Sequence, residues 1–173
     1  MRHTLSILVE NRFGELSRIV GIFSARGYNI ESLSVAETLD PTLSRLTLVT
    51  IGDDATIERI TKQLDKQIRV RKVEDMTATS HIEREMALIH VKAEAGPARQ
   101  EVLSLVGIFR AKVVDVSEDG LIVEASGDWN KVRALINLLR PLGIREIVRT
   151  GTVAISRLPD RSSLEQLETE VAI

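Results

Sequence analysis

The sequence predicts an α+β protein built from two small domains that share one order of elements, βαββαβ. Stretches of alternating apolar residues, typical of half-buried strands, are interspersed with stretches whose apolar residues recur at helical spacing. The order occurs twice, and the tetrapeptide at residues 20–23, VGIF, returns at residues 106–109. With 173 residues, the chain is long enough for two such domains.

The first domain begins with a strand and a helix that are joined by a short loop, residues 10–15. Leu5, Ile7 and Val9 lie on one face of the strand. The apolar face of the helix follows the spacing i, i+3, i+4 and i+7: Leu16, Ile19, Val20 and Phe23. Gly14 stands where the helix opens. A glycine there lets a small anion or zwitterion approach the free N–H groups of the first turn.

Two strands, a helix and a fourth strand complete the first domain. The two strands cover residues 30–37 and 46–51, with a turn at residues 39–42, where Pro41 bars a helix. Asp53 or Asp54 is placed to cap the helix. Its apolar face and the strand after it are formed by Ile57, Ile60, Thr61, Leu64, Ile68, Val70 and Val73. This order over residues 1–76 is the ferredoxin-like arrangement.

The second domain repeats the order over residues 84–157, after a linker at residues 77–83 that begins with small polar residues. Its expected elements are a strand over 86–93, a helix opened by Gly96-Pro97, two strands around a turn at 118–120, a helix capped by Asp128, and a strand over 144–148 that residues 152–155 extend. Residues 158–173 form a polar tail. Its few apolar residues favour a frayed end over a short amphipathic helix.

The shared tetrapeptide sets the register between the two copies at a shift of 86 residues. At this shift Asn11 falls on Pro97, Gly14 on Gln100 and Asn29 on Asp115. The two copies would then share the helix face but differ in the loop. We therefore expect only the first copy to bind a ligand through this loop.

Composition argues against several classes of function. The chain has no cysteine, so it has no disulfide, thiolate zinc site or cysteine nucleophile. A net charge of −2 and an aromatic content of 3% argue against a nucleic-acid-binding protein. The three histidines show no metal-binding spacing, and no nucleophile–base pair emerges. No signal peptide or run of 18 apolar residues is present, which favours a cytoplasmic protein.

Asn11, Gly14 and Asn29 each have an ordinary structural explanation as a capping, packing or turn residue. Their combination favours a function, because all three lie at the ends of the first βαβ crossover. A domain of this size buries a limited share of its surface, so we expect two copies to pair their sheets side by side. The interpretation that fits best is a small-molecule-sensing module that forms a homodimer.

Three motifs make the family recognisable. They are E-N-x-x-G-x-L-x-R at residues 10–18, R-G-Y-N-I-x-S-L at 26–33 and D-P-x-x-S-R at 40–45. Residues 2–157 resemble the small regulatory subunit of acetohydroxyacid synthase, also called acetolactate synthase. The resemblance implies an N-terminal ACT domain over residues 1–76 and a C-terminal ferredoxin-like domain over residues 84–157.

The resemblance implies a non-catalytic partner of a thiamine-diphosphate-dependent large subunit. In the family, that subunit condenses pyruvate with pyruvate or 2-ketobutyrate in branched-chain amino-acid biosynthesis. The small subunit raises its activity and confers feedback inhibition by valine. Thiamine diphosphate, magnesium and FAD are expected in the catalytic subunit and not in this chain. The alternative is a free-standing ACT-domain amino-acid sensor that regulates a different enzyme or a transcription factor.

The resemblance also implies that the effector lies between two ACT domains. Asn11 and Gly14 of one protomer would face Asn29 and Ile30 of the other. Helix-start N–H groups near Gly14 can hold a carboxylate, and asparagine oxygens can accept from an ammonium group. The apolar walls would be Val9, Leu16 and Ile30. Such walls accept valine, leucine or isoleucine.

Overall fold

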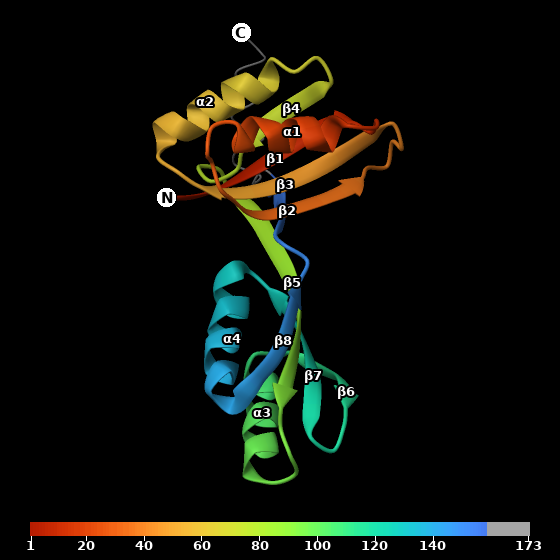
Figure 1. Ribbon diagram of the computed structural model, residues 1–173, viewed down its shortest axis with the longest axis vertical. Helices are drawn as coiled ribbons and strands as arrows, with labels where there is room; N and C mark the ends of the chain where they lie inside the picture. The colour runs from red at the N-terminus through yellow and green to blue at the C-terminus, as the bar shows by residue number, and fades with distance from the viewer. Residues whose placement is uncertain (159–173) are drawn as a thin grey trace.

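In the computed structural model, which describes residues 1–158, the chain folds into two α+β domains (Figure 1). The first contains β1 (Arg2–Glu10), α1 (Glu15–Ser24), β2 (Ile30–Glu37), β3 (Leu43–Ile51), α2 (Asp54–Asp65) and β4 (Val70–Asp75). The second contains β5 (His81–Lys92), α3 (Pro97–Ile108), β6 (Lys112–Val116), β7 (Gly120–Gly127), α4 (Trp129–Gly143), β8 (Ile144–Arg149) and β9 (Val153–Ser156). The expected α+β class is confirmed. The tail at residues 159–173 lies outside the described residues.

Each domain has an antiparallel sheet with its helices on one face. The strand order is β2-β3-β1-β4 in the first sheet and β6-β7-β5-β8 in the second. Alternation along β1 places Leu5, Ile7 and Val9 in the core beneath α1 and α2. The second core is built in the same way, with Ile89 and Val91 of β5 beneath α3 and α4.

Local sequence explains how the helices begin and end. The Asp53 side chain accepts from the Thr56 N–H at 2.6 Å, and Asp128 accepts from the Lys131 N–H at 2.9 Å, so both predicted N-caps are confirmed. Helix α4 continues through Pro141 and ends at Gly143, whose φ is 99°. Ile68 lies outside β4 and is fully exposed, so its predicted place in the fourth strand is wrong.

Strand β5 runs from one domain into the other. Its residues 81–84 pair with β9, and its residues 85–92 pair with β7 and β8. Residues 152–155 were expected to extend the last strand, but β9 instead pairs with the start of β5. The expected linker at 77–83 overlaps β5 from His81 onward, and the domain boundary itself stays a prediction.

The segment between β8 and β9 lies on the face of the first sheet opposite the helices. Ser34 Oγ donates to the Thr150 carbonyl at 2.9 Å, and the Thr152 N–H donates to Ser32 Oγ at 2.8 Å. Gly151 fits between them with a φ of 79°, and a Cβ there would lie 2.7 Å from Ser32 Oγ. The two domains are therefore joined both by β5 and by this contact.

The repeat is confirmed, but its register is not 86. Gly14 and Gly96 each precede a helix with a positive φ, which gives a shift of 82. After each helix a backbone N–H returns to a carbonyl, from Tyr28 to Phe23 and from Ala111 to Val106, which gives a shift of 83. The shift grows by one residue across the helix, so the second copy has one residue more than the first between this glycine and the N–H that closes the helix.

The shared tetrapeptide presents different faces in the two helices. Ile22 is 9% exposed in the first core, whereas Ile108 is 75% exposed. In the corrected register Gly14 does have a counterpart, Gly96, so the expectation that the second copy lacks this glycine is wrong. At the shift of 82 before the helix Asn11 falls on Ala93, and at the shift of 83 after it Asn29 falls on Lys112. The two asparagines therefore still distinguish the first copy.

Candidate functional site

The predicted site residues lie at opposite ends of the first sheet. Asn11 and Gly14 follow the end of β1, whereas Asn29 and Ile30 open β2. Ile30 pairs with Thr50, which in turn pairs with His3 at the start of β1. The ten residues of α1 separate the two groups by about 15 Å. One chain therefore does not bring Asn11 together with Asn29.

The start of α1 is open. Gly14 has a left-handed φ of 85°, no side chain of residues 1–158 caps the helix, and a Cβ built on Gly14 would meet nothing within 4 Å. The first-turn N–H groups of a helix have no intrahelical acceptor. They also carry the positive end of the helix dipole, so this space suits a carboxylate.

A buried carboxylate organises the same end of the domain. Glu15, the first residue of α1, is 3% exposed. Its Oε1 accepts from Arg18 at 3.1 Å and from Arg69 at 2.7 Å. Two arginines thus surround one acid, and they leave excess positive charge beside the helix start.

A second acid near the loop is also shared by two arginines. Glu10 forms ion pairs with Arg12, at 3.2 Å, and with Arg71. Four arginines therefore meet two glutamates in these ion pairs, and a third acid, Glu37, lies beside Asn11, so arginines still outnumber the glutamates around the loop. Sequence reasoning missed Arg69 and Arg71, because Arg71 lies on the edge strand β4 and Arg69 just before it, and no spacing links them to the loop.

Asn11 ties the loop to the β2–β3 hairpin. Its backbone N–H donates to the Thr42 carbonyl at 2.7 Å, and its Nδ2 donates to Glu37 Oε1 and to the Pro41 carbonyl, each at 3.0 Å. No described residue donates to its Oδ1. Asn11 thus has the structural role that its turn position predicts, and its oxygen can still accept from a ligand ammonium group.

The three predicted apolar walls differ in accessibility. Val9 is 2% exposed and packs in the core, so it can only support a binding surface from below. Leu16 is 42% exposed beside Gly14. Ile30 is half-buried at the opposite end of the sheet. Leu16 is thus the exposed one of the three, and it lies in the first turn of α1.

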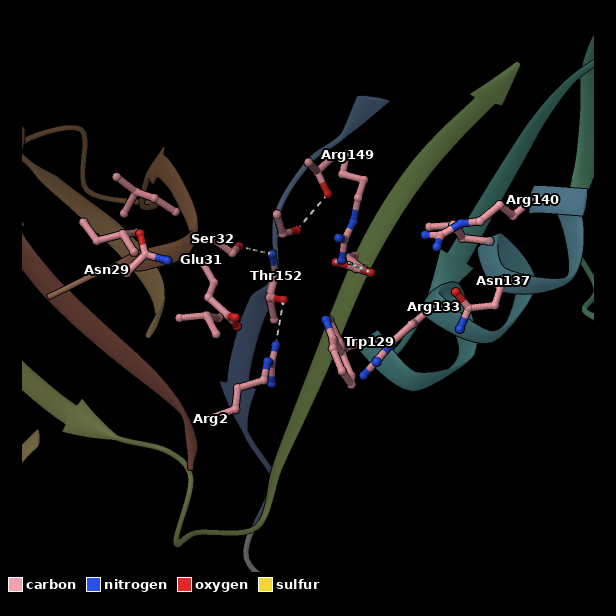
Figure 2. Close-up of a pocket in the computed structure, with 17 residues that line it drawn as sticks. Arg2, Asn29, Glu31, Ser32, Trp129, Arg133, Asn137, Arg140, Arg149 and Thr152 are labelled. Atoms are coloured by element: carbon pink, nitrogen blue, oxygen red, sulfur yellow. Dashed lines mark hydrogen bonds and ion pairs between the residues drawn. The ribbon is translucent and has the colours of Figure 1, made fainter. Parts of the chain in front are cut away.

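A cleft of about 840 Å³ lies between the two domains, and sequence reasoning did not find it (Figure 2). Trp129 stands between two guanidinium groups, that of Arg2 at 5.4 Å from its ring centre and that of Arg133 at 4.6 Å. Arg149 Nη2 contacts both oxygens of the buried Glu85 carboxylate, at 2.7 and 2.6 Å. Asn29 and Ile30 belong to the opposite wall of this cleft.

A buried histidine of β1 contacts an aspartate of β4, the edge strand farthest from β2. The His3 ring is buried, with Nδ1 3.3 Å from Asp75 and Nε2 3.5 Å from Asp54. Burial works to raise the pKa of Asp75. Hydrogen bonds from the Thr77 hydroxyl and N–H, with the contact to His3, together hold that pKa below its usual value of 3.8.

Two negative findings apply to residues 1–158. No group of three or more histidine and acidic residues there is arranged to hold a metal ion. Within the same range, no helix has the length and apolar character needed to cross a membrane.

Comparisons with known proteins cover both domains. A family model described as the AHAS small subunit-like ACT domain matches residues 5–72, and one described as the small subunit of acetolactate synthase matches residues 84–158. The acetolactate synthase small subunit of Mycobacterium leprae is 50% identical over 91% of this chain and 92% of its own length. That of Aquifex aeolicus is 46% identical over 98% of this chain and 86% of its own length.

A solved structure agrees with these sequence matches. The crystal structure of the acetolactate synthase small subunit from Thermotoga maritima superposes with a TM-score of 0.82 at 43% identity. The superposition covers 92% of this chain and 99% of the Thermotoga chain, so both domains take part.

Proposed function

This chain belongs to the family of acetolactate synthase small subunits, and we propose that it raises the activity of a catalytic acetolactate synthase subunit and makes that subunit sensitive to valine. Membership of the family makes it a regulatory subunit that is not an enzyme on its own. The catalytic subunit would hold thiamine diphosphate, magnesium and FAD and would carry out the pyruvate chemistry, in the cytoplasm.

The proposal of a valine site between two chains rests on the separation of the predicted effector residues within one chain. Asn11 and Gly14 lie at one end of the first sheet, and Asn29 and Ile30 lie at the other. Two ACT domains that pair side by side in opposite directions would bring one group from each chain together. Valine would then place its carboxylate at the helix start near Gly14, and its ammonium group at asparagine oxygens.

The contacts of Asn11 suggest how a bound effector reaches the catalytic subunit. Its Nδ2 holds the Pro41 carbonyl and Glu37, so a ligand that moves Asn11 also moves the β2–β3 hairpin. Leu39 at that hairpin is fully exposed, as a partner-binding apolar residue would be. A coupling free energy of about 1–3 kcal/mol between valine and the catalytic subunit is enough for clear inhibition.

The proposal is tested by Gly14→Asp in the full chain, reconstituted with its catalytic subunit. The new carboxylate occupies the anion position, so we expect valine inhibition to weaken by about tenfold or more while activation persists. Gly14→Ala is the control, because it places a side chain on the left-handed backbone without adding a charge. Acetolactate formation is measured against valine concentration.

Asn29→His tests the half of the site that the second chain would supply. If valine inhibition were unchanged in both Gly14→Asp and Asn29→His, the site would lie elsewhere. Calorimetric titration with valine, leucine and isoleucine then ranks the effectors. A chain that bound valine but did not copurify with a thiamine-dependent catalytic chain would instead be a free-standing sensor.

A further inference from the structure

One wall of the cleft between the domains is a row of hydrogen-bond donors on α4. Arg133, Asn137 and Arg140 are spaced at i, i+4 and i+7, so they share one helix face, and all three line the cleft (Figure 2). The facing wall comes from the start of β2, where Asn29 and Glu31 lie. The effector loop does not line this cleft, since neither Asn11 nor Gly14 belongs to it, but Asn29 and Ile30, the other half of the proposed valine site, lie at its margin.

The charges of this cleft are only partly compensated. Arg2 is paired with Glu83 at 3.1 Å and Arg149 with Glu85 at 2.6 Å. By contrast, Arg133 and Arg140 form no ion pair with any residue in 1–158. Across from them, Glu31 is the one acid lining the cleft that is likewise unpaired among these residues.

A buried hydrogen-bond donor without an acceptor is a second feature of this cleft that suits an anion. The Nε atom of Arg2 is buried, and no described residue accepts a hydrogen bond from it. Arg2 lines the cleft beside Trp129. Buried polar groups without a partner are uncommon in folded proteins, and they often mark the place of a ligand or ordered water. Guanidinium and amide donors that surround one space are the groups that bind carboxylates and phosphates.

We propose that this cleft binds a small organic anion, through a phosphate or carboxylate group held by Arg140, Asn137 and Arg133. Glu31 on the opposite wall would accept from a hydroxyl or ammonium group of the same ligand. This site goes beyond the proposed valine site, and its ligand would contact both domains of one chain.

Trp129, the single tryptophan, provides a local readout, because it lies in this cleft. The full chain is titrated with inorganic pyrophosphate and, separately, with succinate, at an ionic strength held constant with KCl. We expect at least one probe to change the Trp129 emission saturably. The probe that binds more tightly tells whether the site prefers phosphate or carboxylate.

Arg140→Gln should raise the dissociation constant about tenfold, the loss expected for one charge-assisted hydrogen bond. Arg59→Gln is the matched control, since Arg59 is exposed on α2 and does not line the cleft. Without a probe, both variants should melt as the wild type does. The proposal is overturned if neither probe gives a saturable change, or if the two variants weaken binding equally. Loss of valine binding with unchanged binding of the probe would bear only on the other site.

Discussion

At the scale of single residues, the buried acids of this chain are held by arginines from distant parts of the sequence. Glu15 meets Arg69, and Glu85 meets Arg149. A buried carboxylate without such a partner would be strongly destabilising. These pairs also set the charge around the helix start and in the cleft, so the same contacts that stabilise the fold prepare both candidate sites.

Asp75 makes the stability of the first domain depend on pH. Its pKa in the folded chain lies below the usual 3.8, because hydrogen bonds from Thr77 and the contact with His3 outweigh the effect of burial. The unfolded chain therefore binds this proton more tightly. The stabilisation is present above the unfolded pKa and is lost as pH falls through the folded pKa.

As the pH falls below about 4, the free energy of unfolding of Asp75→Asn should therefore decrease less than that of the wild type. Urea unfolding followed at several pH values between about 3 and 6 gives the free energies of unfolding. Asp65→Asn is the control, as Asp65 is exposed and its side chain accepts no hydrogen bond from residues 1–158. Equal slopes against pH in wild type and Asp75→Asn would contradict this role of Asp75.

The sequence correctly located the turn and the helix start that carry Asn11 and Gly14, whose role in binding stays a prediction, and it missed other residues of the candidate sites for a physical reason. The positions of Asn11 and Gly14 follow from a turn and a helix start, which a few neighbouring residues determine. Arg69 and Trp129 reach their sites only because strands pair and domains dock. Such contacts join residues that are far apart in sequence, so no local pattern announces them.

At the scale of elements, the two helices that follow the first strand of each domain differ in the face they bury. In α1 the buried apolar residues are Ile19, Ile22 and Phe23, whereas α3 buries Val102 and Val106. Periodicity correctly predicted both helices. It could not fix their register, because two apolar faces offset by about one helical turn give nearly the same spacing.

Ile22→Ala and Ile108→Ala form a matched pair that tests the register. Ile22 is 9% exposed in a packed core, so its truncation should lower the free energy of unfolding by about 2–4 kcal/mol. Ile108 is 75% exposed, so the same truncation should cost less than about 0.5 kcal/mol. Urea unfolding measures both. Equal costs would restore the shift of 86 that the shared tetrapeptide indicates.

At the scale of the whole molecule, the two domains are joined by small residues that meet across more than a hundred positions. Ser32 and Ser34 of β2 hold the backbone at Thr150 and Thr152. The sequence predicts residues 152–155 only as an extension of the last strand, since nothing near them shows that this segment contacts the first sheet. This contact and β5 fix one domain against the other, and the interdomain cleft lies between them (Figure 2).

Gly151→Ala should weaken this junction. A Cβ at residue 151 would lie 2.7 Å from Ser32 Oγ, and the φ of 79° disfavours any side chain, so the hydrogen bonds at Ser32 and Ser34 would be strained or lost. We expect the free energy of unfolding to fall by about 3–4 kcal/mol, from backbone strain of about 1–2 kcal/mol and from two hydrogen bonds of about 1 kcal/mol each. The first and second domains should then unfold in separate steps, and small-angle scattering should give a larger radius of gyration.

Gly21→Ala is the control, because Gly21 lies inside α1 with nothing within 4 Å of its Cβ position, and alanine there should stabilise the helix by about 0.5–1 kcal/mol. A Gly151→Ala chain as compact as Gly21→Ala would mean that the contact of Ser32 and Ser34 is not needed to hold the domains together.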